Sequence, residues 1–170
     1  MARESCSSVA IALALLCPGC SLLLDFSDSA APHDAAGDAP YTAAECAYLE
    51  PNDTLQTAMP ITPGTDTGPA AICAGPTPDE DWYKLAVPST ATSVTVAIQF
   101  TNARGDLDLE LYDSAGTNVA RSLTFNDGET IACPASDPPC PVLAAGDYEF
   151  RVFPGQPGAV NSYTFSVMIQ

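Results

Sequence analysis

The chain has 170 residues, with 21 acidic against 5 basic side chains, and its formal net charge at pH 7 is −16. A surface this negative argues against nucleic acid and anionic lipid headgroups as partners, because clusters of Lys and Arg bind both. It suits a soluble exported protein, and it suits cations. Calcium is the natural candidate outside the cell, because it prefers hard oxygen ligands.

The first twenty residues have the pattern of an export signal. A polar start leads into an unbroken apolar run over residues 9–16, and Pro18-Gly19 ends this run just before Cys20. The run is too short to cross a bilayer core of about 30 Å as a helix. The pattern therefore predicts a signal peptide over 1–19. Cys17 and Cys20 also form a CxxC pair, but no second ligand pair accompanies them that would favour a zinc or redox site.

Gly19-Cys20 resembles the lipobox of bacterial lipoproteins, in which the cysteine is lipidated on its thiol and becomes the new N-terminus. This resemblance implies a membrane anchor at Cys20 in the bacterial cell envelope. Ser21 stands where an inner-membrane retention signal often has Asp, which favours the outer membrane. Ordinary secretion is the alternative.

Residues 20–45 are predicted to form the lipidated N-terminus and a disordered tether. The stretch is rich in Ala, Asp, Ser, Pro and Gly, so it buries too little apolar surface to offset the entropy lost on ordering. It would act as a flexible spacer between membrane and domain. The only histidine of the chain, His33, lies here, where no packed shell can orient it as a catalytic base or a zinc ligand.

Four cysteines remain beyond the tether: Cys46, Cys73, Cys133 and Cys140. An even number in an exported chain suggests two disulfides, for which three pairings are possible. Cys133 and Cys140 bracket a Pro-rich turn, so a local bridge between them is favoured. Cys46 would then pair with Cys73.

From residue 46 to 170 the pattern is one of short β-strands. Leu107, Leu109 and Leu111 alternate with polar residues, which is typical of a half-buried strand. Other runs rich in β-branched and aromatic residues lie between turn formers at 82–87, 93–100, 118–123, 147–153 and 162–169. Six to nine short strands in about 125 residues predict one antiparallel sandwich or barrel. The last strand is apolar and long enough to be central.

Several segments, taken in order, resemble the bacterial pre-peptidase C-terminal domain, and together they cover nearly all of 48–169. The resemblance implies an all-β, antiparallel, jelly-roll-like sandwich that forms a single domain over 46–170. It also implies an accessory module that is not an enzyme, attached to secreted proteases or found alone in exported proteins. The matching segments are Glu50-Pro-Asn-Asp-Thr54, Ala58-Met-Pro-Ile61, Asp79-Glu-Asp-Trp-Tyr-Lys-Leu85, Gly105-Asp-Leu-Asp-Leu-Glu-Leu-Tyr-Asp113, Leu143-Ala-Ala-Gly-Asp-Tyr-Glu-Phe-Arg-Val152 and Ser162-Tyr-Thr-Phe-Ser-Val167.

The resemblance also implies a calcium site. In collagen-binding relatives, acids in two segments coordinate calcium; Glu50, Asn52 and Asp53 match the first segment here, and Asp79 and Asp81 match the second. Four carboxylates and an amide are hard oxygen donors, and unpaired carboxylates at close range repel one another without a cation. The alternative is that all five are solvated turn residues.

Asp106, Asp108 and Glu110 form a second acidic group, because their spacing places three carboxylates on one face of a strand. The spacing differs from that of an EF-hand loop. An exposed strand face is the favoured interpretation. A second cation site or a partner surface are the alternatives.

The sequence thus predicts an exported, lipid-anchored binding or adhesion module without catalytic residues. Its partner would be an extracellular or periplasmic protein or glycan, and calcium is the candidate cofactor. A structural envelope lipoprotein without a dedicated ligand is one alternative, and a hydrolase that uses two carboxylates is another. Five aromatic residues are candidates for a sugar platform, although core packing is the default at strand positions: Trp82, Tyr83, Tyr112, Tyr148 and Tyr163.

Overall fold

The computed structural model describes residues 41–64, 67–136 and 139–170. The predicted signal peptide, Cys20 and His33 lie outside these ranges. Within them, no helix has the length and apolar character needed to span a membrane.

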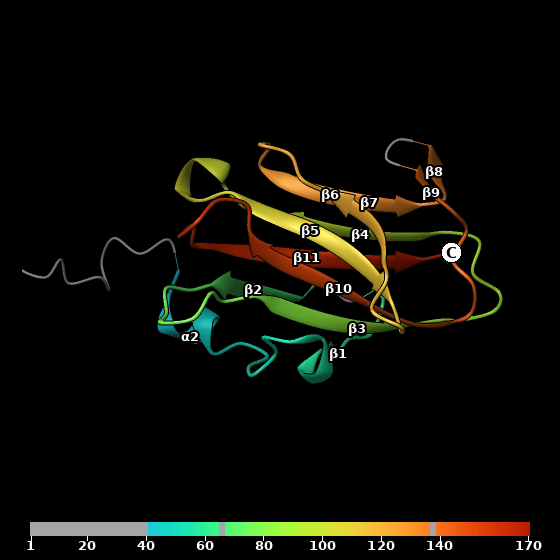
Figure 1. Ribbon diagram of the computed structural model, residues 1–170, viewed down its shortest axis with the longest axis horizontal. Helices are drawn as coiled ribbons and strands as arrows, with labels where there is room; N and C mark the ends of the chain where they lie inside the picture. Colours follow the sequence, from blue (N-terminus) through green and yellow to red (C-terminus); the bar gives the residue numbers. More distant parts are fainter. Residues whose placement is uncertain (1–40, 65–66, 137–138) are drawn as a thin grey trace, which may run out of the picture. The chain divides into compact units, whose positions relative to one another are not determined.

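Two β-sheets packed face to face form the domain (Figure 1). The first sheet has the order β1 (Met59–Pro60), β3 (Asp81–Val87), β10 (Gly146–Pro154), β5 (Leu107–Asp113) and β6 (Asn118–Ser122). The second has the order β2 (Thr67–Ile72), β11 (Asn161–Ile169), β4 (Val94–Gln99) and β7 (Gly128–Cys133). β8 (Ala135–Ser136) and β9 (Pro139–Cys140) form a small separate hairpin. The short helical turns are α2 (Ala43–Cys46), η1 (Leu55–Thr57) and η2 (Asn102–Arg104).

All strand pairs within the two large sheets are antiparallel except β1 with β3. The predicted all-β sandwich is therefore confirmed. The last strand, β11, lies between β2 and β4, so the expectation that it is central is also confirmed.

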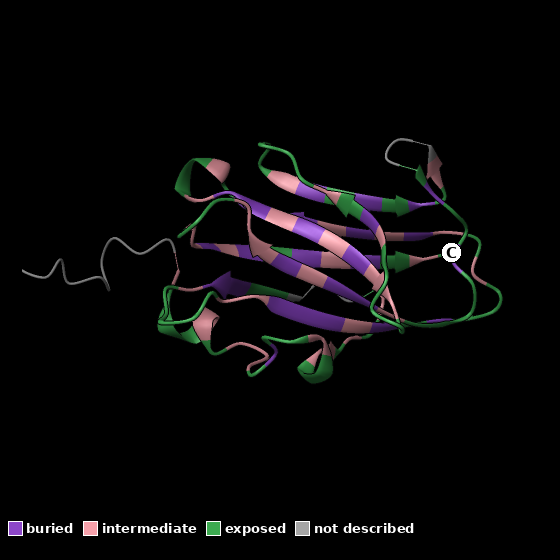
Figure 2. Ribbon diagram, in the orientation of Figure 1, coloured by how far each residue is buried: buried purple, intermediate pink, exposed green. Residues whose placement is uncertain are grey.

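The core lies between the two sheets, and the alternation of the sequence creates it. Successive side chains of a strand point to opposite faces, so every second residue of β5 is buried and the residues between are partly exposed (Figure 2). Tyr83 from β3, Phe150 from β10 and Phe165 from β11 form an aromatic group at the centre, with ring centroids 4.4–5.5 Å apart. These rings join both sheets, and their burial is a main source of stability.

Both favoured disulfides are present, Cys46–Cys73 and Cys133–Cys140. The first joins α2 to the end of β2 across 27 positions of sequence, and the second closes a local loop of 7. The two bridges therefore have different structural roles.

The folded unit begins earlier than the predicted tether boundary at residue 45. Thr42 caps α2 through a capping box with Glu45, and the hydroxyl of Tyr41 accepts a hydrogen bond of 3.0 Å from the backbone N–H of Ala74. Residues 41–45 are thus tied to the domain, because the capping box satisfies the backbone N–H groups of Thr42 and Glu45 and the adjacent Cys46 is cross-linked to Cys73.

Candidate functional site

Three carboxylates meet beside the start of β3. Glu50 and Asp53 lie in the loop that follows α2, and Asp79 lies in the loop between β2 and β3. One carboxylate oxygen from each lies within 4.8 Å of the others. We refer to these three residues as the acidic cluster. The two loops that carry it are far apart in sequence, so the sandwich itself brings the acids together.

The backbone conformation at Leu49 and two hydrogen bonds fix the first loop, which carries Glu50 and Asp53. Leu49 adopts a left-handed conformation with φ of 63°, which turns the chain directly before Glu50. The carboxylate of Glu50 then accepts a 2.9 Å hydrogen bond from the backbone N–H of Asn52. The N–H of Trp82 donates to the carbonyl of Asn52 at 2.9 Å, which fixes this loop against β3.

The second loop is held by the Cys46–Cys73 disulfide. The backbone N–H of Cys73 donates a 2.6 Å hydrogen bond to Oδ2 of Asp79. The other half-cystine, Cys46, is the last residue of α2, just before the loop that carries Glu50. The bridge therefore ties the two halves of the acidic cluster to one another.

Asn52 and Asp81, the other two predicted calcium ligands, form a buried layer behind the cluster. Asn52 is 0% exposed and Asp81 is 2% exposed. With the amide nitrogen of Asn52 turned toward both acids, it donates to Oε2 of Glu50 at 2.9 Å and to Oδ1 of Asp81 at 3.1 Å. Both residues thus support the cluster from within the fold.

Asp81 connects this layer to the core. Its Oδ2 accepts a hydrogen bond from the hydroxyl of Tyr163, and that hydroxyl lies 2.7 Å from the hydroxyl of Tyr83. Both tyrosines are fully enclosed between the sheets. A chain of hydrogen bonds therefore runs from the acidic cluster through Asn52 and Asp81 into the centre of the sandwich.

Burial and mutual repulsion make the carboxylates hard to ionise together. Burial raises the pKa of Asp79 to about 6, and the nearby charges of Glu50 and Asp53 raise it as well. Burial raises the pKa of Asp81 to about 8, although the hydrogen bond from Tyr163 opposes this shift. The ion pairs within the described ranges lie elsewhere, between Lys84 and Asp147 and around Arg151.

This donor set fits a divalent cation. The cluster offers three carboxylates at short range with no basic side chain bound to them in the described part of the chain, and calcium prefers such oxygen ligands. A cation would neutralise the repulsion that adds to the effect of burial on the pKa of Glu50 and Asp79. Glu50, Asp53 and Asp79 are the residues placed to hold it.

Replacing Tyr163 by Phe tests the buried hydrogen-bond chain. The substitution leaves Oδ2 of Asp81 without its donor in a buried place. We expect the free energy of unfolding to fall by about 1–3 kcal/mol, because an unpaired buried acceptor loses both water and its partner. Urea unfolding measures the change. Tyr148→Phe, at a half-buried position on β10, is the control; an equal loss in both variants would contradict this role.

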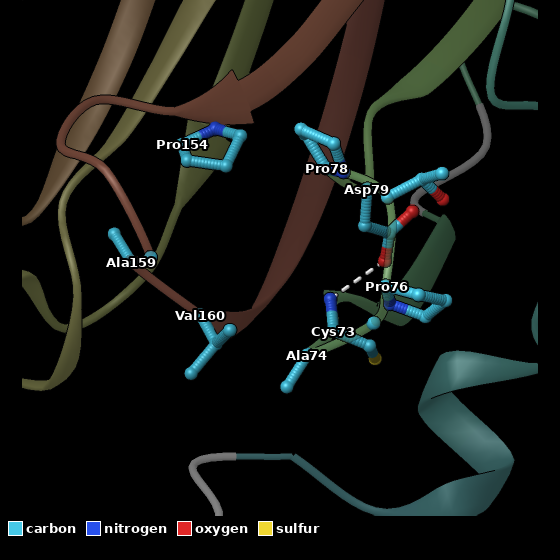
Figure 3. Close-up of a pocket in the computed structure, with 11 residues that line it drawn as sticks. Cys73, Ala74, Pro76, Pro78, Asp79, Pro154, Ala159 and Val160 are labelled. Atoms are coloured by element: carbon cyan, nitrogen blue, oxygen red, sulfur yellow. Dashed lines mark hydrogen bonds between the residues drawn. The ribbon is translucent and has the colours of Figure 1, made fainter.

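A pocket of about 360 Å³ opens beside the acidic cluster. Pro76 and Pro78 line one side and Pro154, Ala159 and Val160 line the other (Figure 3). Asp79 belongs both to the pocket wall and to the cluster, with its hydrogen bond to Cys73 at the edge of the pocket. The walls are mainly apolar, so the pocket suits a small, largely apolar group.

The outer face of the first sheet carries a group that sequence reasoning missed. The guanidinium carbon of Arg151 lies 4.0 Å from the ring centroid of Phe153, 5.5 Å from that of Trp82 and 6.0 Å from that of Tyr112. Arg151 also forms ion pairs with Glu80 at 3.1 Å and Glu110 at 2.6 Å. Only the strand register, which pairs Arg151 with Trp82 and Glu110, brings these residues together.

The five aromatic candidates therefore do not form one platform. Tyr83 and Tyr163 are buried between the sheets, whereas Trp82 and Tyr112 pack beside Arg151 on the outer face. Trp82 is only 8% exposed. Core packing accounts for the positions of Tyr83 and Tyr163. Cation–π packing with Arg151 accounts for those of Trp82 and Tyr112.

The favoured interpretation of Asp106, Asp108 and Glu110 as an exposed face is wrong. Asp106 is buried, Asp108 is half-buried, and Glu110 pairs with Arg151. Burial raises the pKa of Asp108 to about 6, and the charges of Asp106 and Glu129 add to this. Long-range packing covers these acids, which the alternation of the strand alone does not reveal.

Fold and site together define a β-sandwich module with a carboxylate cluster where the N-terminal loop meets the sheets. Residues 79–154 match the family model of the bacterial pre-peptidase C-terminal domain. The family match thus supports, over residues 79–154, the resemblance that the sequence segments indicated. Pre-peptidase C-terminal domains are generally non-catalytic modules.

A solved structure of a pre-peptidase C-terminal domain agrees with this fold. The pre-peptidase C-terminal domain of a collagenase from Bacillus anthracis is 18% identical, with a TM-score of 0.51 over 69% of this chain and 96% of that chain. PliG from Salmonella Typhimurium, a periplasmic inhibitor of g-type lysozyme, is 17% identical, with a TM-score of 0.36 over 66% of this chain and 98% of that chain. A comparison with curated proteins found no match.

Proposed function

We propose that this chain is an exported, lipid-anchored accessory module that binds a protein or a glycan in a calcium-dependent way. The observation that carries the proposal is the acidic cluster, which shares Asp79 with the neighbouring pocket. The match of residues 79–154 to a family of generally non-catalytic modules supports a binding role.

Calcium would be held by Glu50, Asp53 and Asp79. When bound, it would supply positive charge that joins the loop after α2 to the loop between β2 and β3. Asn52 and Asp81 would keep the ligands in place through their hydrogen bonds to Glu50 and to the core. The role of the cation is thus structural, because it fixes two loops that otherwise repel each other.

Calcium would influence ligand binding through the loop between β2 and β3. Residues 73–79 of this loop form one wall of the pocket, and Asp79 ends that wall. Fixing Asp79 fixes the wall before the ligand arrives, and a pre-formed wall lowers the entropy lost on binding. A protein side chain or the apolar face of a sugar ring would suit walls made of Pro, Ala and Val.

Calcium is expected to raise the melting temperature of the chain. At a concentration one hundred times the dissociation constant, a bound ligand stabilises by about 2.7 kcal/mol. The combined variant Glu50→Gln, Asp53→Asn, Asp79→Asn should lose this gain. Asp147→Asn is the control, because it removes an acid paired with Lys84 at the far end of β3. Melting curves in EDTA and in calcium measure the effect. If calcium raised the melting temperature of the combined variant as much as that of Asp147→Asn, calcium would not bind at the acidic cluster.

Ligand recognition is tested by a pull-down from envelope and culture fluid with the anchored chain. We expect a protein or glycan to be retained in calcium and lost in EDTA. The combined variant of the acidic cluster should retain nothing in either buffer. Retention that is the same with and without the cation would contradict calcium-dependent binding, and no retention at all would favour a structural lipoprotein.

The lipid anchor is tested by labelling with a radioactive fatty acid. We expect the label on the wild-type chain and on Cys17→Ala, because only Cys20 follows the predicted cleavage point at Gly19. Cys20→Ala should carry no label. Labelling of Cys20→Ala at the wild-type level would contradict an anchor at this residue.

A further inference from the structure

A second pair of acids lies at the start of β5, beneath the turn that joins β10 to β11. Asp106 directly precedes β5 and Asp108 lies within it. The backbone N–H of Gly155, the first residue after β10, donates a 2.9 Å hydrogen bond to the carbonyl of Asp106. This hydrogen bond holds the turn over the two carboxylates.

Gly155 shows how closely both carboxylates crowd this turn. A Cβ atom at position 155 would lie 2.5 Å from Oδ2 of Asp106 and 3.2 Å from Cγ of Asp108. The two carboxyl groups therefore occupy the same side of Gly155. Two carboxylates held this close repel each other unless positive charge lies between them.

Asp106 also has an oxygen without a partner. The residue is 8% exposed, and its Oδ1 accepts no hydrogen bond from any described residue. A buried carboxylate oxygen left unpaired is costly, so such an atom calls for a ligand or an ion. The basic side chains in the described ion pairs are Lys84 and Arg151, and they pair with other acids.

Glu129 adds negative charge at this place without competing as a ligand. It is 1% exposed, and its two carboxylate oxygens accept hydrogen bonds from Ser122 and Thr124. Its charge acts on both Asp106 and Asp108. Asp106, Asp108 and Glu129 thus create a negative potential at this place. Of the three, only Asp106 and Asp108 have carboxylate oxygens available to bind a cation.

We propose that Asp106 and Asp108 bind a divalent cation, at a second site separate from the acidic cluster. The ligands are the carboxylates of Asp106 and Asp108, which both approach Gly155. Water completes the coordination, so a hard cation such as calcium or manganese fits. The site fastens the turn between β10 and β11 to the start of β5, and residues of this turn line the pocket beside Asp79.

Calcium titration by calorimetry on the full chain separates the two sites. We expect two binding events for the wild type. The combined variant of the acidic cluster should keep one event, and Asp106→Asn with Asp108→Asn should keep the other. All five substitutions together should abolish binding. The second site is overturned if the acidic-cluster variant binds no calcium. The proposed calcium role of the acidic cluster fails instead if Asp106→Asn with Asp108→Asn binds none.

Manganese gives a test that needs no variant. In NMR spectra of the wild-type chain, trace Mn²⁺ should broaden the amide signals of residues 105–108 and of Gly155, and excess calcium should restore them. Broadening confined to residues 50–53 and 79–81 would overturn the second site. Unchanged signals throughout would overturn it too, because the two carboxylates would then share a proton and not a cation.

Discussion

Replacing Cys46 and Cys73 by serine is expected to lower the free energy of unfolding by about 3–4 kcal/mol. The bridge joins positions 27 residues apart, and a disulfide that closes a loop of this length removes much of the entropy of the unfolded chain. The bridge also connects α2 to the end of β2, so its loss frees the N-terminal loop from the sandwich.

The same change is expected to weaken calcium binding at the acidic cluster. Cys73 donates its backbone N–H to Asp79, and Cys46 directly precedes the loop that positions Glu50. Without the bridge, the two loops must be brought together by the cation alone. Part of the binding energy is then used to order the chain, which lowers the affinity.

The other disulfide provides a matched control. Cys133 and Cys140 close a loop of only 7 positions on the β8–β9 hairpin, for which the same entropic argument gives about 2–3 kcal/mol. Replacing this pair by serine should leave calcium affinity unchanged. Denaturant unfolding measures stability and calorimetry measures affinity. Equal loss of affinity in the two double variants would show that the first bridge has no special link to the acidic cluster.

Strands that alternate cleanly were predictable from the sequence, and those with an internal break were not. In β5, the alternating leucines predicted to face the core are the buried residues of the strand. β2 contains Gly68 and Pro69, which weaken a strand pattern, and β7 carries Glu129 at an inward, buried position. Each of these strands is stabilised by its neighbours in the second sheet, β11 and β4, and such pairing leaves no local signal.

The acidic cluster shows a different limit. Glu50, Asp53 and Asp79 came from the family resemblance, because no short-range spacing links the two segments that carry them. The separate layer of Asn52 and Asp81 needed the structure, since Asp81 accepts a hydrogen bond from the buried Tyr163 of a distant strand and Asn52 donates to Asp81. Composition and alternation identify the acidic residues. Tertiary packing decides which of them form the acidic cluster and which lie buried and hydrogen-bond to it.

The stability of the calcium-free chain is expected to depend on pH. Asp79 and Asp81 have folded-state pKa values of about 6 and about 8, against an ordinary value of 3.8. Between the ordinary value of 3.8 and the raised values, the folded chain retains protons on Asp79 and Asp81 that the unfolded chain has released. Folding stability from these groups is therefore fully present below the ordinary value, and it is lost as pH rises through about 6 and then about 8.

In EDTA, the melting temperature is thus expected to fall as the pH is raised from 5 to 8. Calcium binds the ionised carboxylates, so its stabilising effect should grow over the same range. Asp81→Asn carries no ionisable group at the buried position and should flatten the EDTA profile, whereas Asp147→Asn should follow the wild type. The difference between the two variants isolates the contribution of the buried carboxylate of Asp81. A profile of Asp81→Asn parallel to the wild type would mean that Asp81 is already ionised in the folded chain, and that Tyr163 and Asn52 stabilise its charge without a cation.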